Sequence, residues 1–115
     1  MPIWEKTTKE DIEKSLFSLE KLYNFEIISE IIIIYDGKKS KKIDFYIPTK
    51  LSGKVIKKFI AKNSGPGVAR NIGVENSSSK YIFLIDAGDT CHQERINLQY
   101  PMVIKYGVSY SNIEY

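Results

Sequence analysis

The sequence predicts an α/β fold, a Rossmann-like and mainly parallel β-sheet flanked by helices. Three observations predict it: helical and strand patterns alternate, the predicted strands are rich in β-branched residues, and an aspartate directly follows two of them. Parallel sheets gather their ligands at the carboxyl ends of the strands. We therefore expect a ligand site near Asp36 and Asp86, which end these two strands.

The first half of the chain predicts one helix and at least one strand. Thr8 and Asp11 resemble a capping box, and the apolar residues that follow at helical spacing predict an amphipathic helix over 8–23. The β-branched run in "SEIIIIYDG" predicts a buried strand that ends in a turn. Residues 37–53 predict a loop with a short element, whereas 54–63 fit a helix or a strand, of which we favour the strand.

The second half predicts two helices and two strands. The segment "NSGPGVARNIGVENSSSK" predicts a helix that glycines open, and "KYIFLID", residues 80–86, predicts the clearest strand. "TCHQERINLQ" predicts a helix with Thr90 as its cap, and residues 107–113 predict a last strand.

The composition predicts one globular domain over residues 1–115. A chain of 115 residues with 43% hydrophobic residues forms one core and is too short for two ordinary domains. Because Cys91 is the only cysteine, an internal disulfide is excluded, and a cytoplasmic location fits best. The longest apolar run is too short to cross a bilayer, and the first residues lack the pattern of a signal peptide.

Positive charge is concentrated in one stretch of the sequence. Between Gly37 and Lys62 there are nine lysines and one acidic residue, Asp44. This stretch can face phosphates, nucleic acid or an anionic membrane surface, or it can be a solvated face that keeps the protein soluble. Because no recognised nucleic-acid motif accompanies the lysines, we expect no nucleic-acid partner.

The turn Asp86-Ala87-Gly88-Asp89 presents two carboxylates after a predicted strand. Carboxylate oxygens suit Mg²⁺ or Mn²⁺, which hold one or two protein carboxylates together with the phosphates of a substrate. The same residues also fit a hydrogen-bonded turn in which Asp89 or Thr90 caps the next helix. These residues alone leave both interpretations open.

Two further polar residues are candidates for the site. Asp36 either accepts hydrogen bonds from a nucleobase or ribose, or it is a turn residue. The glycines before Arg70 resemble a phosphate cradle, although Pro66 removes one amide donor from it. Arg70 itself either neutralises a phosphate or pairs with a strand-end aspartate.

Two segments are more informative together than alone, "EKSLFSLEKLYNFEIISEIIIIYDG" and "NSGPGVARNIGVENSSSKYIFLIDAGD". Together they closely resemble the nucleotide-sugar half of family 2 glycosyltransferases, which have the GT-A fold. In that family a helix with an "SL.S" core leads to a strand ending in Asp-Asp-Gly, followed by "N.G...ARN.G" and "(Y)I.FLD.DD". The resemblance implies a nucleoside diphosphate sugar donor and a glycan or glycolipid acceptor. It also implies bacterial surface glycan synthesis, in the cytoplasm or at the inner face of the membrane.

The resemblance assigns roles to individual residues. Asp36 matches the second aspartate of Asp-Asp-Gly, which contacts the base, while Trp4 matches an aromatic residue beside the base and Pro2 the proline before it. Asp86 matches the first acid of the Asp-x-Asp signature, near the ribose and the metal, and Asp89 matches the acid that follows the signature. The metal, or Arg70 of the "ARN.G" motif, is expected to offset charge on the diphosphate.

Three residues depart from the family pattern. Tyr35 replaces the first aspartate of Asp-Asp-Gly, Glu5 replaces an asparagine, and Gly88 stands where the central Asp-x-Asp carboxylate is expected. The last departure leaves two expectations for the metal. Either Asp89 reaches the Mg²⁺ or Mn²⁺ instead, or the donor binds with weaker dependence on metal.

The extent of the resemblance predicts that the chain is the donor-binding half alone, a truncated GT-A fold without the acceptor half. The family's complete first strand would lie in the middle of the sheet, so its loss leaves neighbouring backbone groups unpaired. A homo-oligomer can cover these groups. The sequence also leaves two alternatives to a catalytic glycosyltransferase domain. The first is a non-catalytic nucleotide-sugar-binding or assembly module, and the second is a basic domain that binds nucleic acid or anionic lipid.

Overall fold

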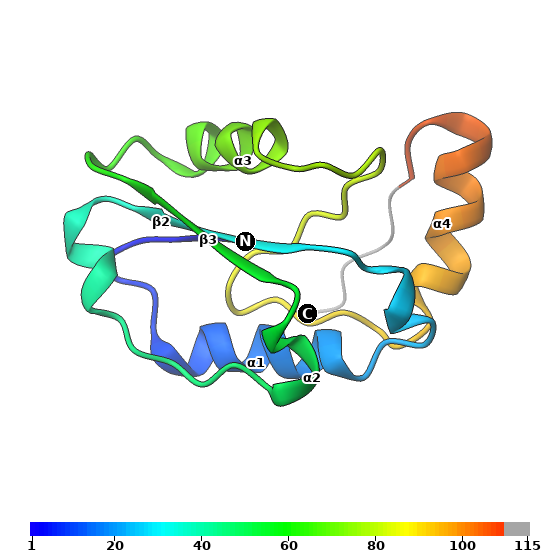
Figure 1. The fold of residues 1–115 in the computed structure, drawn as a ribbon, viewed down its shortest axis with the longest axis horizontal. Coiled ribbons are helices and arrows are strands. Elements are labelled where there is room, and N and C mark those ends of the chain that lie inside the picture. The colour runs from blue at the N-terminus through cyan, green and yellow to red at the C-terminus, as the bar shows by residue number, and fades with distance from the viewer. Residues whose placement is uncertain (110–115) are drawn as a thin grey trace.

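The computed structural model describes residues 1–109 and confirms the α/β fold class (Figure 1). The three strands form one parallel sheet in the order β1-β2-β3. The elements in chain order are β1 (Pro2–Ile3), α1 (Lys9–Glu20), η1 (Phe25–Ile27), β2 (Ile31–Asp36), η2 (Lys38–Lys42), α2 (Thr49–Ser52), β3 (Val55–Ile60), α3 (Pro66–Glu75) and α4 (Arg95–Tyr106).

Helices cover both faces of the sheet. Figure 1 shows α3 on one face, α1 and α2 on the other, and α4 beside the sheet. The main core lies between α1 and the sheet, where Leu16 and Ile33 are fully buried. On the opposite face, Gly73 brings α3 close to β2, because a Cβ atom at this position would lie 3.0 Å from Ile34 Cδ1.

The first predicted helix is present but shorter than predicted. The Thr8 hydroxyl accepts a hydrogen bond from the Asp11 backbone N–H at 3.1 Å, which confirms the predicted start. The helix ends at Glu20 instead of residue 23. The φ of Asn24 is 57°, which is outside the helical range, so the chain turns away from the helix here. Leu22, just before this turn, is buried in the core.

The strands β2 and β3 pair along their full lengths. Six residue pairs join them, from Ile31 with Val55 to Asp36 with Ile60. This pairing confirms the buried strand before Asp36 and the preference for a strand over 54–63. The segment between them contains η2 and α2, in agreement with a loop that includes short elements.

The glycine-opened helix is also confirmed. It begins at Pro66, where the missing N–H would have no partner within the helix in any case, and it follows Gly65, whose φ is 91°. It ends at Glu75, before the serine-rich segment.

The prediction of a strand over residues 80–86 is wrong. The side chains of Phe83 and Ile85 do pack against the core, which accounts for the apolar pattern. A strand also needs a neighbour along its backbone, and β1 contributes only two pairs to the sheet, both with β2. A cavity of about 510 Å³ separates this segment from β2, and no strand forms between residues 61 and 109.

The last predicted helix begins later than predicted, and Thr90 does not cap it. Helix α4 starts at Arg95, and its N-cap residue, Glu94, makes no capping hydrogen bond through its side chain. The Cys91 backbone N–H donates to Ser18 Oγ at 3.0 Å, which ties this part of the chain to α1 and holds it outside the helix. Gly107, with a φ of 82°, ends α4.

The last predicted strand, residues 107–113, lies partly outside the described residues, and 107–109 are not in a strand. Within the described part of the chain, the helices are all too short or too polar to cross a bilayer.

Candidate functional site

Asp36 ends β2 at the carboxyl edge of the sheet and is only 4% exposed. Its carboxylate oxygens accept hydrogen bonds from the backbone N–H groups of Ser64 at 2.8 Å and Gly65 at 3.0 Å. These amides precede α3, so Asp36 connects the end of β2 to the start of that helix. This contact gives Asp36 a structural role, while its predicted contact with a base stays a prediction.

A small cavity of about 240 Å³ lies beside Asp36. Its lining consists of Glu5, Asp36, Gly37, Lys38, Lys39, Ala61 and Asn63. Trp4 is not part of this lining: its side chain is 43% exposed, and the Lys6 ammonium lies 5.6 Å from the centroid of its ring. The structure therefore brings Asp36 together with Glu5 and two lysines, and it leaves the predicted aromatic residue outside.

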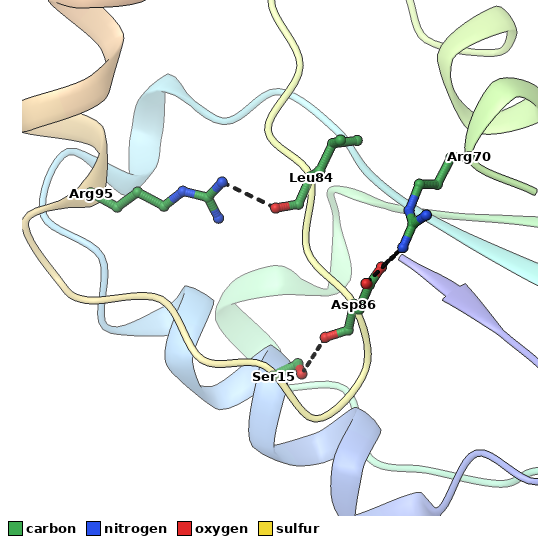
Figure 2. A network of polar contacts seen from close by, with 5 residues as sticks. All are labelled: Ser15, Arg70, Leu84, Asp86 and Arg95. Atoms are coloured by element: carbon green, nitrogen blue, oxygen red, sulfur yellow. Dashed lines mark hydrogen bonds and ion pairs between the residues drawn. The ribbon is translucent and has the colours of Figure 1, made fainter. Parts of the chain in front are cut away.

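Arg70 and Asp86 form an ion pair that joins α3 to the acidic turn (Figure 2). Arg70 Nη2 donates to both carboxylate oxygens of Asp86, at 2.8 and 2.7 Å. The two side chains are 35% and 47% exposed, so solvent reaches the pair. Pairing with a strand-end aspartate is one of the two roles that the sequence left open for Arg70.

Ser15 holds the acidic turn in place from α1, and the sequence analysis did not identify it. Its side chain is completely buried, and Oγ donates to the Asp89 carbonyl at 2.7 Å. Oγ also lies 3.2 Å from the Asp86 carbonyl, the contact that Figure 2 shows. The same oxygen accepts the Gly88 N–H at 2.9 Å. A serine beside Leu16 on the buried side of the helix was the available signal, because a polar residue buried there needs a partner.

Glycine at position 88 follows from the geometry of the turn. Its φ is 97°, a conformation that residues with a side chain rarely adopt, and its N–H also donates to the Asp11 carbonyl at 3.1 Å. A Cβ atom at Gly88 would lie 3.4 Å from Asp11 Oδ1. A carboxylate at this position would therefore approach another carboxylate as well as strain the backbone.

The site fits a resident divalent cation poorly. Asp86 and Asp89 are the two residues predicted to hold it, and the carboxylate of Asp86 is already paired with Arg70. The central carboxylate of the family signature is missing, because Gly88 stands in its place. Within residues 1–109, no group of three or more Asp, Glu, His or Cys side chains is placed to hold a metal ion. Binding of Mg²⁺ or Mn²⁺ by Asp86 and Asp89 stays a prediction.

The α-amino group of Met1 lies at the edge of the sheet, close to the Arg70–Asp86 pair. It donates to the Ile32 carbonyl at 2.9 Å. Burial lowers its pKa from 8.0 to about 6; the charge of Asp86 acts against this shift, and the charge of Arg70 adds to it. Pro2, the next residue, pairs with Ile34 and lines the larger cavity, away from the cavity beside Asp36.

The structure is thus an α/β domain with a parallel sheet, a buried aspartate at the end of β2 and a partly exposed Arg–Asp pair that joins α3 to the acidic turn. The model of the family "Glycosyl transferase family 2" matches residues 1–113. The chain therefore belongs to family 2 of the glycosyltransferases.

Similar proteins include uncharacterized glycosyltransferases from two Rickettsia species. The protein of Rickettsia conorii is 34% identical over 86 residues, 75% of this chain and 14% of the relative. The protein of Rickettsia felis is 33% identical over 106 residues, 92% of this chain and 16% of the relative. This chain thus spans only about a seventh of the length of these relatives. No solved structure gives a significant match.

Proposed function

We propose that this chain binds a nucleoside diphosphate sugar, as the donor-binding part of a glycosyltransferase. The observation that carries the proposal is the partly exposed Arg70–Asp86 pair, whose acidic turn Ser15 of α1 holds in place. A guanidinium group there can bind a diphosphate, because planar N–H donors match phosphate oxygens. The family membership of the chain supports the same conclusion.

Different residues would bind the base and the diphosphate of the donor. The cavity beside Asp36 would take the base, with the Asp36 oxygens as acceptors and the two lysines as sources of positive charge. Within residues 1–109, the hydrogen bonds that Arg70 donates through its side chain come from Nη2 alone, so its other N–H groups are available to the diphosphate. Trp4 would reach the base only by moving towards this cavity.

In the complete protein, the reaction would transfer the sugar to an acceptor hydroxyl of a glycan or glycolipid. The bond between the anomeric carbon and the diphosphate oxygen breaks, and a bond to the acceptor oxygen forms as that hydroxyl loses its proton. Arg70 would stabilise the negative charge that develops on the leaving diphosphate. In this role the protein would act in the cytoplasm or at the inner face of the membrane, in the synthesis of bacterial surface glycans.

A second candidate is a module that binds the nucleotide sugar without turning it over. Gly88 favours this candidate, because the turn lacks the central carboxylate of the family signature. Both candidates require donor binding, and they differ in whether the purified chain hydrolyses or transfers the donor.

Calorimetric titration with UDP, GDP and CDP tests donor binding directly. We expect one of them to bind, and Arg70→Gln to weaken binding by about tenfold, the loss typical of a charge-assisted hydrogen bond. Arg95→Gln is the matched control, because Arg95 is the only other arginine and donates to the Leu84 carbonyl instead of to a carboxylate of the site. Absence of binding at millimolar nucleotide would overturn the proposal.

The same titration, repeated with Mn²⁺ and with a chelator, tests the predicted cation. If Asp86 and Asp89 hold Mg²⁺ or Mn²⁺, Asp86→Asn and Asp89→Asn each remove the metal-dependent part of binding. If Arg70 supplies the positive charge alone, the chelator leaves binding unchanged and Asp89→Asn has no effect.

A further inference from the structure

An aromatic stack with lysines over it forms part of the surface at the edge of the sheet. We call it the lysine–aromatic patch, and its members are Tyr35, Lys41, Phe45, Lys57 and Phe59. The Phe59 ring stacks on Tyr35 with centroids 4.7 Å apart, and Tyr35 stacks in turn on Phe45 at 6.4 Å. The Lys41 ammonium lies 4.8 Å from the Phe59 centroid, and that of Lys57 lies 5.4 Å from the Phe45 centroid. These contacts place two positive charges beside an exposed phenylalanine.

The stretch of sequence that contains Lys41, Phe45, Lys57 and Phe59 carries a large excess of positive charge. Nine lysines and one acidic residue lie between Gly37 and Lys62. Within the described residues, Lys39 is the one lysine of these nine that forms an ion pair, with Glu5 at 3.4 Å. Lys50 and Lys54 donate to the backbone carbonyls of Glu20 and Ile28, so the other six lysines of the stretch are available to an external anionic partner.

We propose that the lysine–aromatic patch binds the surface of an anionic phospholipid bilayer. Lysine ammonium groups bind lipid phosphates as point charges, and a cluster of four to eight basic residues is typical of such contacts. Phe59 is 53% exposed, so its ring edge can enter the boundary between headgroups and acyl chains. Charge and apolar surface thus meet at the same place, as an anionic membrane requires.

The details of the patch favour a bilayer over a nucleic acid. Nucleic acids without a fixed sequence are bound by aromatic rings whose faces are open for stacking. Here one face of Phe59 lies against Tyr35, and Lys41 is placed over the ring. The stretch also contains no arginine, the residue best suited to bidentate phosphate contacts.

Binding to this surface would bring the donor site close to the membrane. Lys38 and Lys39 continue the positive charge from η2 to the cavity beside Asp36. A glycolipid acceptor would then meet the donor at the bilayer surface. The proposal itself concerns the patch alone and does not depend on donor binding.

Co-sedimentation with vesicles tests the proposal in the full chain. The probes are vesicles of phosphatidylcholine alone and vesicles of equal parts phosphatidylcholine and phosphatidylglycerol. We expect binding to the second kind only, weakened by added salt. The double variant Lys41→Glu/Lys57→Glu should lower the partition coefficient by at least about tenfold, since each lysine near the surface contributes on the order of a factor of five.

A matched control keeps the same chemistry elsewhere on the molecule. Lys80 and Lys105 also lie over aromatic rings, at 5.4 Å from the Tyr81 centroid and 5.1 Å from the Tyr106 centroid. The variant Lys80→Glu/Lys105→Glu changes the net charge equally and should bind vesicles better than the patch variant does. Circular dichroism verifies that both variants are folded.

Three results would overturn the proposal. The first is equal binding to neutral and anionic vesicles, and the second is an equal loss in the patch and control variants, which would show an effect of net charge alone. The third is salt-dependent binding of single-stranded RNA by a chain that ignores both kinds of vesicle, which would make this a nucleic-acid surface.

Discussion

Strand β2 has one neighbour on each side, and the two sides differ in how much of the strand is paired. On the β3 side, six residue pairs extend from Ile31 to Asp36. On the β1 side, two pairs join the end of β2 to Pro2 and Ile3, and a cavity of about 510 Å³ lies beside the rest of the strand. The same strand thus has a complete edge and an incomplete one.

This difference shows that apolar side chains do not make a strand by themselves. Phe83 and Ile85 contribute to the core, yet the segment that carries them lies across the cavity from β2 and has no strand partner. Pairing is a non-local condition, because it requires backbone groups of a neighbouring strand along the whole length.

Removing side-chain volume from β2 should cost more in the closed core than beside the cavity. Ile33 is fully buried, so Ile33→Ala should lower the free energy of unfolding by about 4 kcal/mol. Ile32 lines the cavity, so Ile32→Ala should cost only about 1 kcal/mol, because the space around it is already partly empty. Urea unfolding measures both values, and equal losses would contradict the comparison.

Loss of the Ser15 hydroxyl should loosen the acidic turn. Ser15→Ala leaves the Asp89 carbonyl and the Gly88 N–H without this partner. We therefore expect the free energy of unfolding, measured by thermal unfolding, to fall by about 3 kcal/mol. Ser52→Ala is the control, since Ser52 donates to the Thr49 carbonyl on the surface, and it should cost less than about 1 kcal/mol. Weaker nucleotide binding by folded Ser15→Ala protein would show that the turn positions Asp86.

The α-amino group of Met1 should make stability depend on pH. Its pKa is about 6 in the fold and 8.0 as the ordinary value, so the unfolded chain binds the proton more tightly. Stability is therefore greatest above pH 8 and falls by about 3 kcal/mol as the pH drops through this window to below 6. Denaturant titrations of a chain acetylated at Met1 provide the control, because that chain should lose this part of the pH dependence.

The smallest effect is expected for Arg95, which forms a hydrogen bond with the segment that lies across the cavity from β2. Its Nη2 donates to the Leu84 carbonyl at 3.0 Å, as Figure 2 shows. Arg95→Gln should cost about 1 kcal/mol and speed hydrogen exchange in residues 82–85 more than in β3. Uniform acceleration along the chain would instead mean that Arg95 stabilises the whole fold.

Local patterns predicted most of the fold, and the errors lie where tertiary contacts decide. The helix that Thr8 caps, β2 and α3 follow from spacing, capping and β-branched content. The start of α4 could not be predicted, because a hydrogen bond from Cys91 to Ser18 sets it from a distant part of the sequence.

In the site, too, local features were predicted and long-range contacts were not. Strand-end position and family resemblance identified Asp36, Arg70 and Asp86, and the structure joins the last two directly. It does not bring Trp4 to Asp36, because Trp4 follows β1 on the surface. Ser15 was missed because its partners, Asp86 and Asp89, lie more than seventy positions further along the chain.

The position of Met1 has a practical consequence for anyone who expresses this domain. Its amino group donates to Ile32 at the incomplete edge of β2, so residues fused before Met1 would start next to the large cavity. An affinity tag placed there could pair with β2 as an added strand and change stability, pH response and assembly together.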